Sequence, residues 1–226
     1  MRCVPRTIRH RIAVATVAAI CVGAGLGEAQ TSYRNTASVC IDLTVIENLT
    51  GPTFTAMRGE ASRIWLRHGI VLRWTPPASG GCDAVVPVAF DDIRLRRALG
   101  GKSSKALAVT VFRGRSRLVY VSVPRAFEML ARMDELHSGI VSGGAAESRG
   151  GTLLGRVVAH ELGHVLLNTR AHADTGLMRP IFEQRDALSS AAAATDLSPK
   201  AETYLATRFS LVPLAAPGRS TAQVQR

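Results

Sequence analysis

The stretch VVAHELGHVLLNTRAHADTGLM, residues 157–178, combines a helical pattern with side chains that can bind a metal ion. Apolar residues recur at helical spacing over 152–167, which predicts one amphipathic helix. His160 and His164 are four residues apart, so that helix places their rings one above the other on the same face. Two imidazoles in this position can reach a single ion. The stretch therefore predicts a metal site on a helix.

Glu161 lies between the two histidines and completes the pattern H-E-x-x-H. A carboxylate at this position can lean over the open side of the ion and take a proton from water. Neutral imidazoles leave the charge of zinc intact, and zinc lowers the pKa of its bound water to about 7. The residues thus predict His160 and His164 as ligands, Glu161 as general base and Zn2+ as cofactor.

These residues, followed by His172 and the segment TGLM that ends at Met178, resemble the metzincin zinc endopeptidases. That family has the motif H-E-x-x-H-x-x-G-x-x-H and a methionine turn downstream. The resemblance implies that His172 is the third ligand and that Met178 packs beneath the metal without binding it. Leu167 stands at the motif's glycine and Arg170 at its third histidine. We expect the helix to end about one residue later, with Asn168 in a left-handed conformation.

Three residues are candidates for the third ligand when spacing alone is considered. His172 lies eight residues beyond His164, far enough for the chain to leave the helix and return, and it adds a neutral imidazole. Asp174 can bind through oxygen, and Glu183 lies nineteen residues beyond His164, as in a thermolysin-like arrangement. That arrangement requires a regular helix, for which Pro180 leaves little room. His172 is the prediction, with Asp174 ahead of Glu183.

The chain ahead of the motif alternates between strand and helix patterns. Alternating apolar residues predict a strand over 38–45, and helical spacing predicts a helix over 53–68 that stops at Gly69. The segment 70–74 predicts a second strand, and this strand–helix–strand order favours parallel pairing. The segment 84–90 is interpreted as an edge strand because it contains a proline.

Further along, the segments 106–112 and 117–123 predict two strands that form a hairpin around RGRS. A helix is expected over 124–137, and the glycine-rich segment 142–151 is expected to be a flexible loop. Pro199 at a first-turn position supports a helix over 198–209.

These elements predict an α+β fold in which a small, mixed, twisted sheet packs on helices. The resemblance implies a metzincin-like architecture with an active-site helix and a small C-terminal subdomain. We expect a signal peptide over 1–29, a single zinc metallopeptidase domain over 30–212, and a flexible tail over 213–226.

The first 29 residues have a basic head, a short apolar run over 12–26 and small residues at 27–29, as in a secretory signal peptide. The apolar run is shorter than a membrane span requires, so we expect a secreted or periplasmic protein with no transmembrane segment after cleavage. Cys40 and Cys82 are the two cysteines beyond this segment. In an exported chain they are predicted to form a disulfide.

Positive charge persists after the expected cleavage, since 24 of 28 basic and 16 of 17 acidic side chains remain, a net charge of +8. This balance favours anionic envelope surfaces as partners. The runs RLRR (94–97) and RGRSR (113–117) lack interleaved aromatic residues, so we interpret them as solvated loops and expect no nucleic-acid binding. The chain is expected to be a monomer.

The leading hypothesis is an exported zinc-dependent endopeptidase for peptide or protein substrates. An edge strand, either 106–112 or 117–123, would align the substrate by strand addition. One alternative is a zinc hydrolase that acts on a non-peptide substrate such as cell-wall material. Another is an inactive metal-binding envelope module, against which the presence of Glu161 counts, because a purely structural site has no use for a base.

Overall fold

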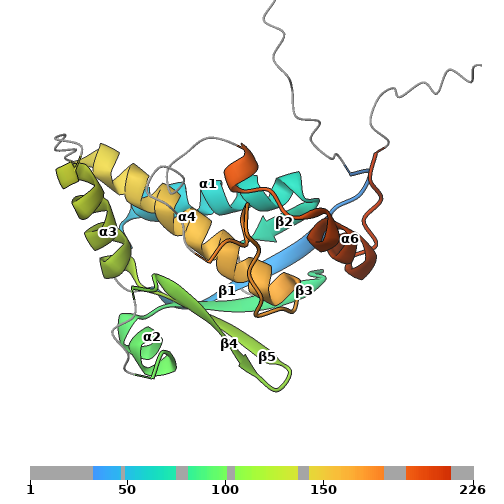
Figure 1. Cartoon of the computed structure of the whole chain (residues 1–226), viewed down its shortest axis with the longest axis horizontal. Coiled ribbons are helices and arrows are strands. Elements are labelled where there is room, and N and C mark those ends of the chain that lie inside the picture. Colours follow the sequence, from blue (N-terminus) through green and yellow to red (C-terminus); the bar gives the residue numbers. More distant parts are fainter. Residues whose placement is uncertain are drawn as a thin grey trace, which may run out of the picture.

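The computed structural model forms a sheet covered on one face by helices (Figure 1). Within the described residues the fold is α+β, with a five-stranded mixed sheet and five α-helices, as the sequence predicts. The expected signal peptide, Glu183 and nearly all of the expected tail lie outside the described residues. The described ranges are 33–46, 49–74, 81–100, 105–136, 143–180 and 192–214.

The sheet has the strand order β2-β1-β3-β5-β4. β1 (Ala37–Ile46) lies between β2 (Ile70–Arg73) and β3 (Ala84–Phe90) and is parallel to both. β5 (Ser116–Val121) is parallel to β3, and it pairs in antiparallel fashion with β4 (Ala108–Arg113). The parallel β1–β2 pair and the hairpin are confirmed. Of the two hairpin strands, β4 lies at the edge of the sheet and β5 does not.

The prediction that β3 is an edge strand is wrong, because β3 has β1 on one side and β5 on the other. Two irregularities explain how a central strand accommodates Pro87. Pairing with β5 begins only at Val88, one residue later. On the other side, the register of β1 shifts between Leu43 and Val45, close to the residue paired with Pro87. A proline lacks the N–H that a regular ladder needs, and such irregularities reduce that need.

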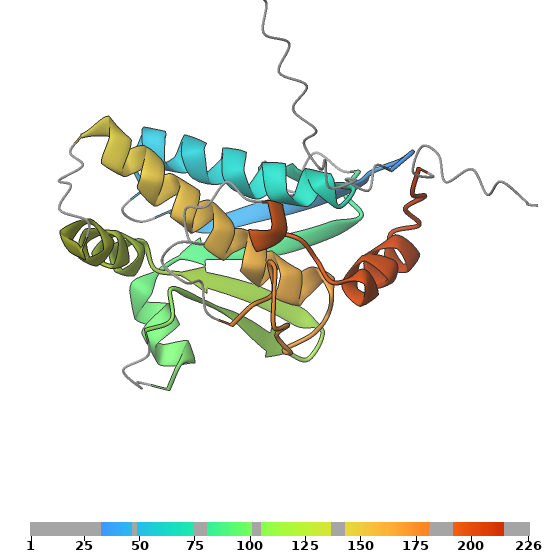
Figure 2. The ribbon, with the colours of Figure 1, turned by 45° about the horizontal axis from the view of Figure 1, so that its top comes forward.

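α1 (Gly51–Arg67) and α4 (Gly144–Leu166) lie side by side on one face of the sheet (Figures 1 and 2). α3 (Val123–Leu136) packs against α4, while α2 (Asp92–Ala98) lies near the β4–β5 hairpin. α6 (Pro199–Arg208) begins at the Ser198 cap, as the position of its proline predicts. The core lies between α1, α4 and the sheet. Its largest fully buried side chains include Trp65, Met57, Ile64, Leu154, Leu162, Ile41 and Phe90.

The expected loop over 142–151 is wrong, because α4 begins at Gly144. Glycine disfavours helices, but here it allows close packing. A Cβ on Gly151 would lie 2.5 Å from the Thr53 carbonyl oxygen of α1, and one on Gly155 would lie 2.7 Å from the Met57 carbonyl oxygen. The missing side chains therefore let the two helix backbones approach each other, and this packing outweighs local propensity.

The run RLRR is a helix and not the expected loop. The side chain of Asp91 caps α2 by accepting a hydrogen bond from the Arg94 N–H at 2.8 Å. Leu95 is fully buried and anchors the helix, while Arg96 and Arg97 are exposed to solvent. The second run, RGRSR, forms the ends and turn of the β4–β5 hairpin.

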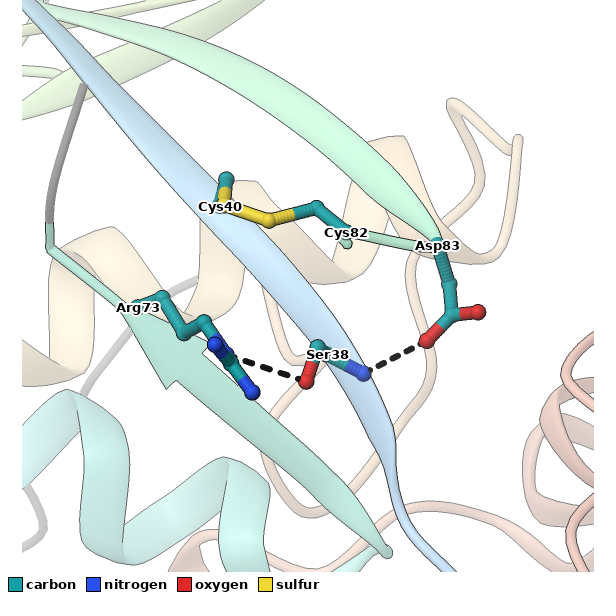
Figure 3. Close-up of a disulfide and its surroundings, with 5 residues drawn as sticks. All are labelled: Ser38, Cys40, Arg73, Cys82 and Asp83. Carbon is teal, nitrogen blue, oxygen red and sulfur yellow. Dashed lines mark hydrogen bonds between the residues drawn. A yellow bond between two sulfur atoms is a disulfide. The ribbon is translucent and has the colours of Figure 1, made fainter. Parts of the chain in front are cut away.

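The predicted disulfide is present between Cys40 of β1 and Cys82, which lies two residues before β3 (Figure 3). The two Cα atoms are 5.8 Å apart. Beside it, the Ser38 N–H donates to the Asp83 carboxylate at 2.7 Å, and Arg73 Nε donates to the Ser38 hydroxyl at 3.1 Å. The first bond holds the start of β3 against β1, and the second holds the end of β2 against the same strand. Among the described residues, no helix is long and apolar enough to cross a membrane.

Candidate metal centre

Three histidines converge at the C-terminal half of α4. His160 and His164 come from the helix, and His172 comes from the segment that follows it. One ring nitrogen from each of these residues can be chosen so that all three lie within 4.8 Å of one another. The first two side chains are buried and the third is exposed, so the cluster is supported by the helix and open to solvent on one side.

Backbone carbonyls orient the two helical histidines. His160 Nδ1 donates to the Leu177 carbonyl at 2.7 Å, and His164 Nδ1 donates to the Thr169 carbonyl at 2.9 Å. In each neutral ring the proton is therefore on Nδ1 and the Nε2 atom carries a lone pair. The two Nε2 atoms face each other at 3.1 Å. Two nitrogens bound to one tetrahedral zinc ion would be about 3.3 Å apart. Opposed lone pairs at this distance fit a shared cation.

Burial keeps both of these histidines neutral. It lowers the pKa of His160 to about 4, and the neighbouring His164 and His172 add to the effect. Burial also lowers the pKa of His164, and the electrostatic interaction with His172 lowers it further. A neutral imidazole is the form that binds a metal, so the pair is ready for an ion at neutral pH.

Glu161 is buried beside the cluster and faces the edge strand β4. Its carboxylate Oε2 accepts a hydrogen bond from the Thr110 hydroxyl at 2.6 Å. Burial raises the pKa of Glu161 to about 7, while the hydrogen bonds from Thr110 act in the opposite direction. A carboxyl group with this pKa can both accept and return a proton near neutral pH.

The chain leaves α4 by the route expected from the sequence. Leu167 forms the C-cap, and Asn168 has a φ of 49°, so the predicted left-handed residue is confirmed. The segment then returns toward the helix, where the ring centroid of His172 lies 5.3 Å from that of His160 and 4.8 Å from that of His164. Asp174 is exposed and lies outside the cluster of described metal-binding side chains.

Met178 is buried against the backbone of α4 at Gly163. A Cβ on that glycine would lie 2.2 Å from the Met178 sulfur, so with any other residue there the end of the methionine side chain would have to shift. Gly163 directly precedes His164. Met178 thus packs against the helix that carries the histidines, and it lies next to Leu177, whose carbonyl orients His160.

The loop that carries Leu177 is fixed by a distant part of the chain. The Leu177 N–H donates to the Asp196 carbonyl at 2.9 Å, and a Cβ on Gly176 would lie 2.1 Å from that same oxygen. Arg67, at the end of α1, forms an ion pair with Asp196 and donates to the Thr195 hydroxyl at 3.1 Å. The orientation of His160 therefore depends on contacts between α1 and the segment before α6.

Several functional contacts have no clear signal in the sequence. The carbonyls of Leu177 and Thr169 orient the histidines, but any residue type supplies a carbonyl. Thr110 lies within the strand predicted over 106–112, but nothing in the local sequence indicates that its side chain contacts Glu161. Its role follows from the position of β4 at the sheet edge beside α4.

Comparison with protein-family models, curated proteins and solved structures gave no match for this chain.

Proposed function

We propose that this protein is an exported zinc-dependent endopeptidase of the metzincin type. The observation that supports the proposal best is the pairing of three convergent histidines with a buried carboxyl group whose pKa lies near 7. A site that only bound a metal for structural reasons would have no use for such a carboxyl group. The disulfide and the basic net charge fit an exported chain that works near anionic surfaces.

Each residue has a distinct role in the proposed reaction. His160, His164 and His172 hold zinc, which when bound acidifies a water molecule and polarises the carbonyl of the scissile peptide. Glu161 accepts a proton from water as the water oxygen attacks the carbonyl carbon. It then delivers that proton to the amine that leaves when the C–N bond breaks. The Thr110 hydroxyl donates to Oε2 of the Glu161 carboxylate and so positions this group.

The edge strand β4 is the proposed guide for the substrate. A peptide in extended conformation can add to this edge through main-chain hydrogen bonds. Because Thr110 of β4 contacts Glu161, a peptide paired with β4 passes next to the proposed base. The β4 edge thus offers a way to align any sequence, as a general endopeptidase requires.

The test is metal analysis combined with digestion of casein and a peptide library, using wild type beside Glu161→Gln. We expect one zinc ion per chain in both proteins, and a loss of cleavage of about 10³-fold in the variant, because proton transfer contributes roughly that much. Zinc without cleavage in either protein would favour a binding module. Cleavage of cell-wall material but of no peptide would favour the alternative hydrolase.

A second test addresses the third ligand. His172→Ala should lose zinc affinity, whereas the matched variant Asp174→Ala should bind zinc like wild type, because Asp174 lies outside the histidine cluster. Both variants are checked for folding by circular dichroism and titrated with zinc against a competing chelator. Tight binding by His172→Ala, with loss in Asp174→Ala or Glu183→Ala, would contradict the assignment.

A further inference from the structure

A groove of about 500 Å³ lies beside the sheet, next to the C-terminal end of α4. It runs between the first residues of β3 (84–87) and the tip of the β4–β5 hairpin (115–117). Val165 of α4, Asn168 after that helix, and Tyr204 and Arg208 of α6 complete its wall. We call this feature the basic groove.

The opening arises where β3 and β5 diverge. These parallel strands pair only from Val88 with Val119 onward, so residues 84–87 precede the paired segment and border the groove. A strand stretch in this position can offer its backbone to another extended chain. Val85, half exposed at 48%, adds an apolar surface that side chains of such a chain can cover.

The charge of the groove is positive. Arg115, Arg117 and Arg208 line it, and none of its described lining residues carries a carboxylate. Arg117 donates to the Asn168 side-chain oxygen at 2.8 Å, and Arg208 donates to the Leu166 carbonyl, so neutral oxygens hold both guanidinium groups in place. Fixed guanidinium groups that carry no paired acid are suited to bind carboxylates.

The basic groove and the candidate metal centre both lie at the C-terminal end of α4, where Val165 and Asn168 line the groove and His164 belongs to the centre. Asn168 is followed by Thr169, whose carbonyl orients His164. The guanidinium groups of Arg117 and Arg170 lie 4.6 Å and 5.0 Å from the ring centroid of Phe112 on β4. Positive charge thus extends from the groove along the edge strand and along the segment that carries His172.

We propose that the basic groove binds an acidic segment of the polypeptide substrate in an extended conformation. The inference rests on the proposed peptidase function and assigns that site a class of substrate. Aspartate and glutamate side chains of the substrate pair with Arg115 and Arg117, and its main chain follows residues 84–87 of β3 on the side that faces β5. The groove then holds the substrate beside the metal centre.

Binding is tested with full-length Glu161→Gln protein and a fluorescent peptide that alternates Asp and Glu with small residues. The control peptide has Asn and Gln at the same positions. We expect the acidic peptide to bind roughly tenfold more tightly, from two or three exposed ion pairs, with a difference that shrinks as salt rises. Arg115→Glu and Arg117→Gln should each reduce this preference. Arg97→Glu, an exposed arginine on α2, should not.

Three results would overturn the inference. The first is that the two peptides bind with equal affinity. The second is that Arg97→Glu and Arg115→Glu lose binding equally. The third is that an oligonucleotide of equal charge displaces the peptide at the same concentration. Cleavage by the wild-type enzyme separates the two proposals. If the enzyme cleaves both peptides with equal KM, the groove assignment fails and the peptidase stands. If it cleaves neither while the acidic peptide still binds through Arg115, the peptidase fails and the groove remains a binding surface.

Discussion

A hydroxyl group on β4 fixes the carboxylate on which the proposed chemistry depends. Thr110→Val keeps the shape of the side chain but removes the hydrogen bond to Glu161. We expect kcat to fall roughly 10- to 100-fold with little change in KM, since one hydrogen bond to a charged group contributes about 1.5–3 kcal/mol. Steady-state kinetics on a peptide substrate would measure this. Thr110→Ser should recover most of the rate, and a serine variant as slow as the valine variant would point to the methyl group instead.

Glu161 also makes the stability of the metal-free protein depend on pH. Burial raises its pKa from 4.5 to about 7, so the folded state holds this proton more tightly than the unfolded chain. The resulting stabilisation is complete below pH 4.5 and is lost as pH rises through 7. Glu161→Gln cannot ionise and should gain stability relative to wild type over this range, by about 3 kcal/mol at pH 8.

The measurement is urea unfolding of both proteins in chelator at pH 4.5, 6 and 8. The comparison cancels the contributions of His160 and His164, whose lowered pKa values act in the opposite direction and add stability as pH rises toward 6.5. A difference between the two proteins that stays constant with pH would contradict the expected ionisation of Glu161.

At the level of single residues, the sequence predicts what is set by local spacing. His160 and His164 meet because a helix repeats every 3.6 residues, and Asn168 ends the helix because it tolerates a left-handed conformation. The partner of Glu161 could not be predicted in this way. Thr110 is 51 residues away, and its contact depends on which strand lies at the edge of the sheet.

At the level of elements, the sequence predicts that a strand or helix forms better than it predicts which elements pack beside it. The strand over 84–90 has the expected bounds, but its central position depends on the packing of other strands, which its own residues do not encode. The start of α4 cannot be predicted from its own residues, because its glycines are typical of a loop, whereas contact with α1 makes them helical.

The glycines of α4 allow a sharp test of this explanation. Gly151→Ala should destabilise the protein by about 1–3 kcal/mol, because its Cβ overlaps the backbone of α1. Gly144→Ala is the matched control, since its Cβ would meet nothing within 4 Å, and it should be neutral or stabilise by up to about 1 kcal/mol. Thermal and urea unfolding would compare the two variants. Equal stability would show that close helix packing at Gly151 is unimportant.

At the level of the whole molecule, the α+β class and the disulfide follow from the sequence, but the strand order does not. Residues 42 positions apart form the disulfide because two cysteines in an exported chain have one simple pairing. The sequence does not limit the possible strand orders in the same way. β5 pairs with β3 although α2 and β4 intervene in the chain, and only the packed core selects that arrangement.

The ion pair between Arg67 and Asp196 predicts a consequence for the whole molecule, namely that metal affinity at the candidate centre is coupled to the order of the segment around Asp196. The path runs from Arg67 through Asp196 to Leu177, whose carbonyl orients His160. If order along this path raises the affinity for the metal by some factor, metal binding must favour that order by the same factor. Zinc should therefore slow hydrogen exchange of the Leu177 amide, and Arg67→Ala should weaken zinc binding roughly 10-fold, as loss of an outer-shell partner commonly does. Unchanged exchange on adding zinc, together with unchanged affinity in Arg67→Ala, would show that the metal centre and the end of α1 are energetically independent.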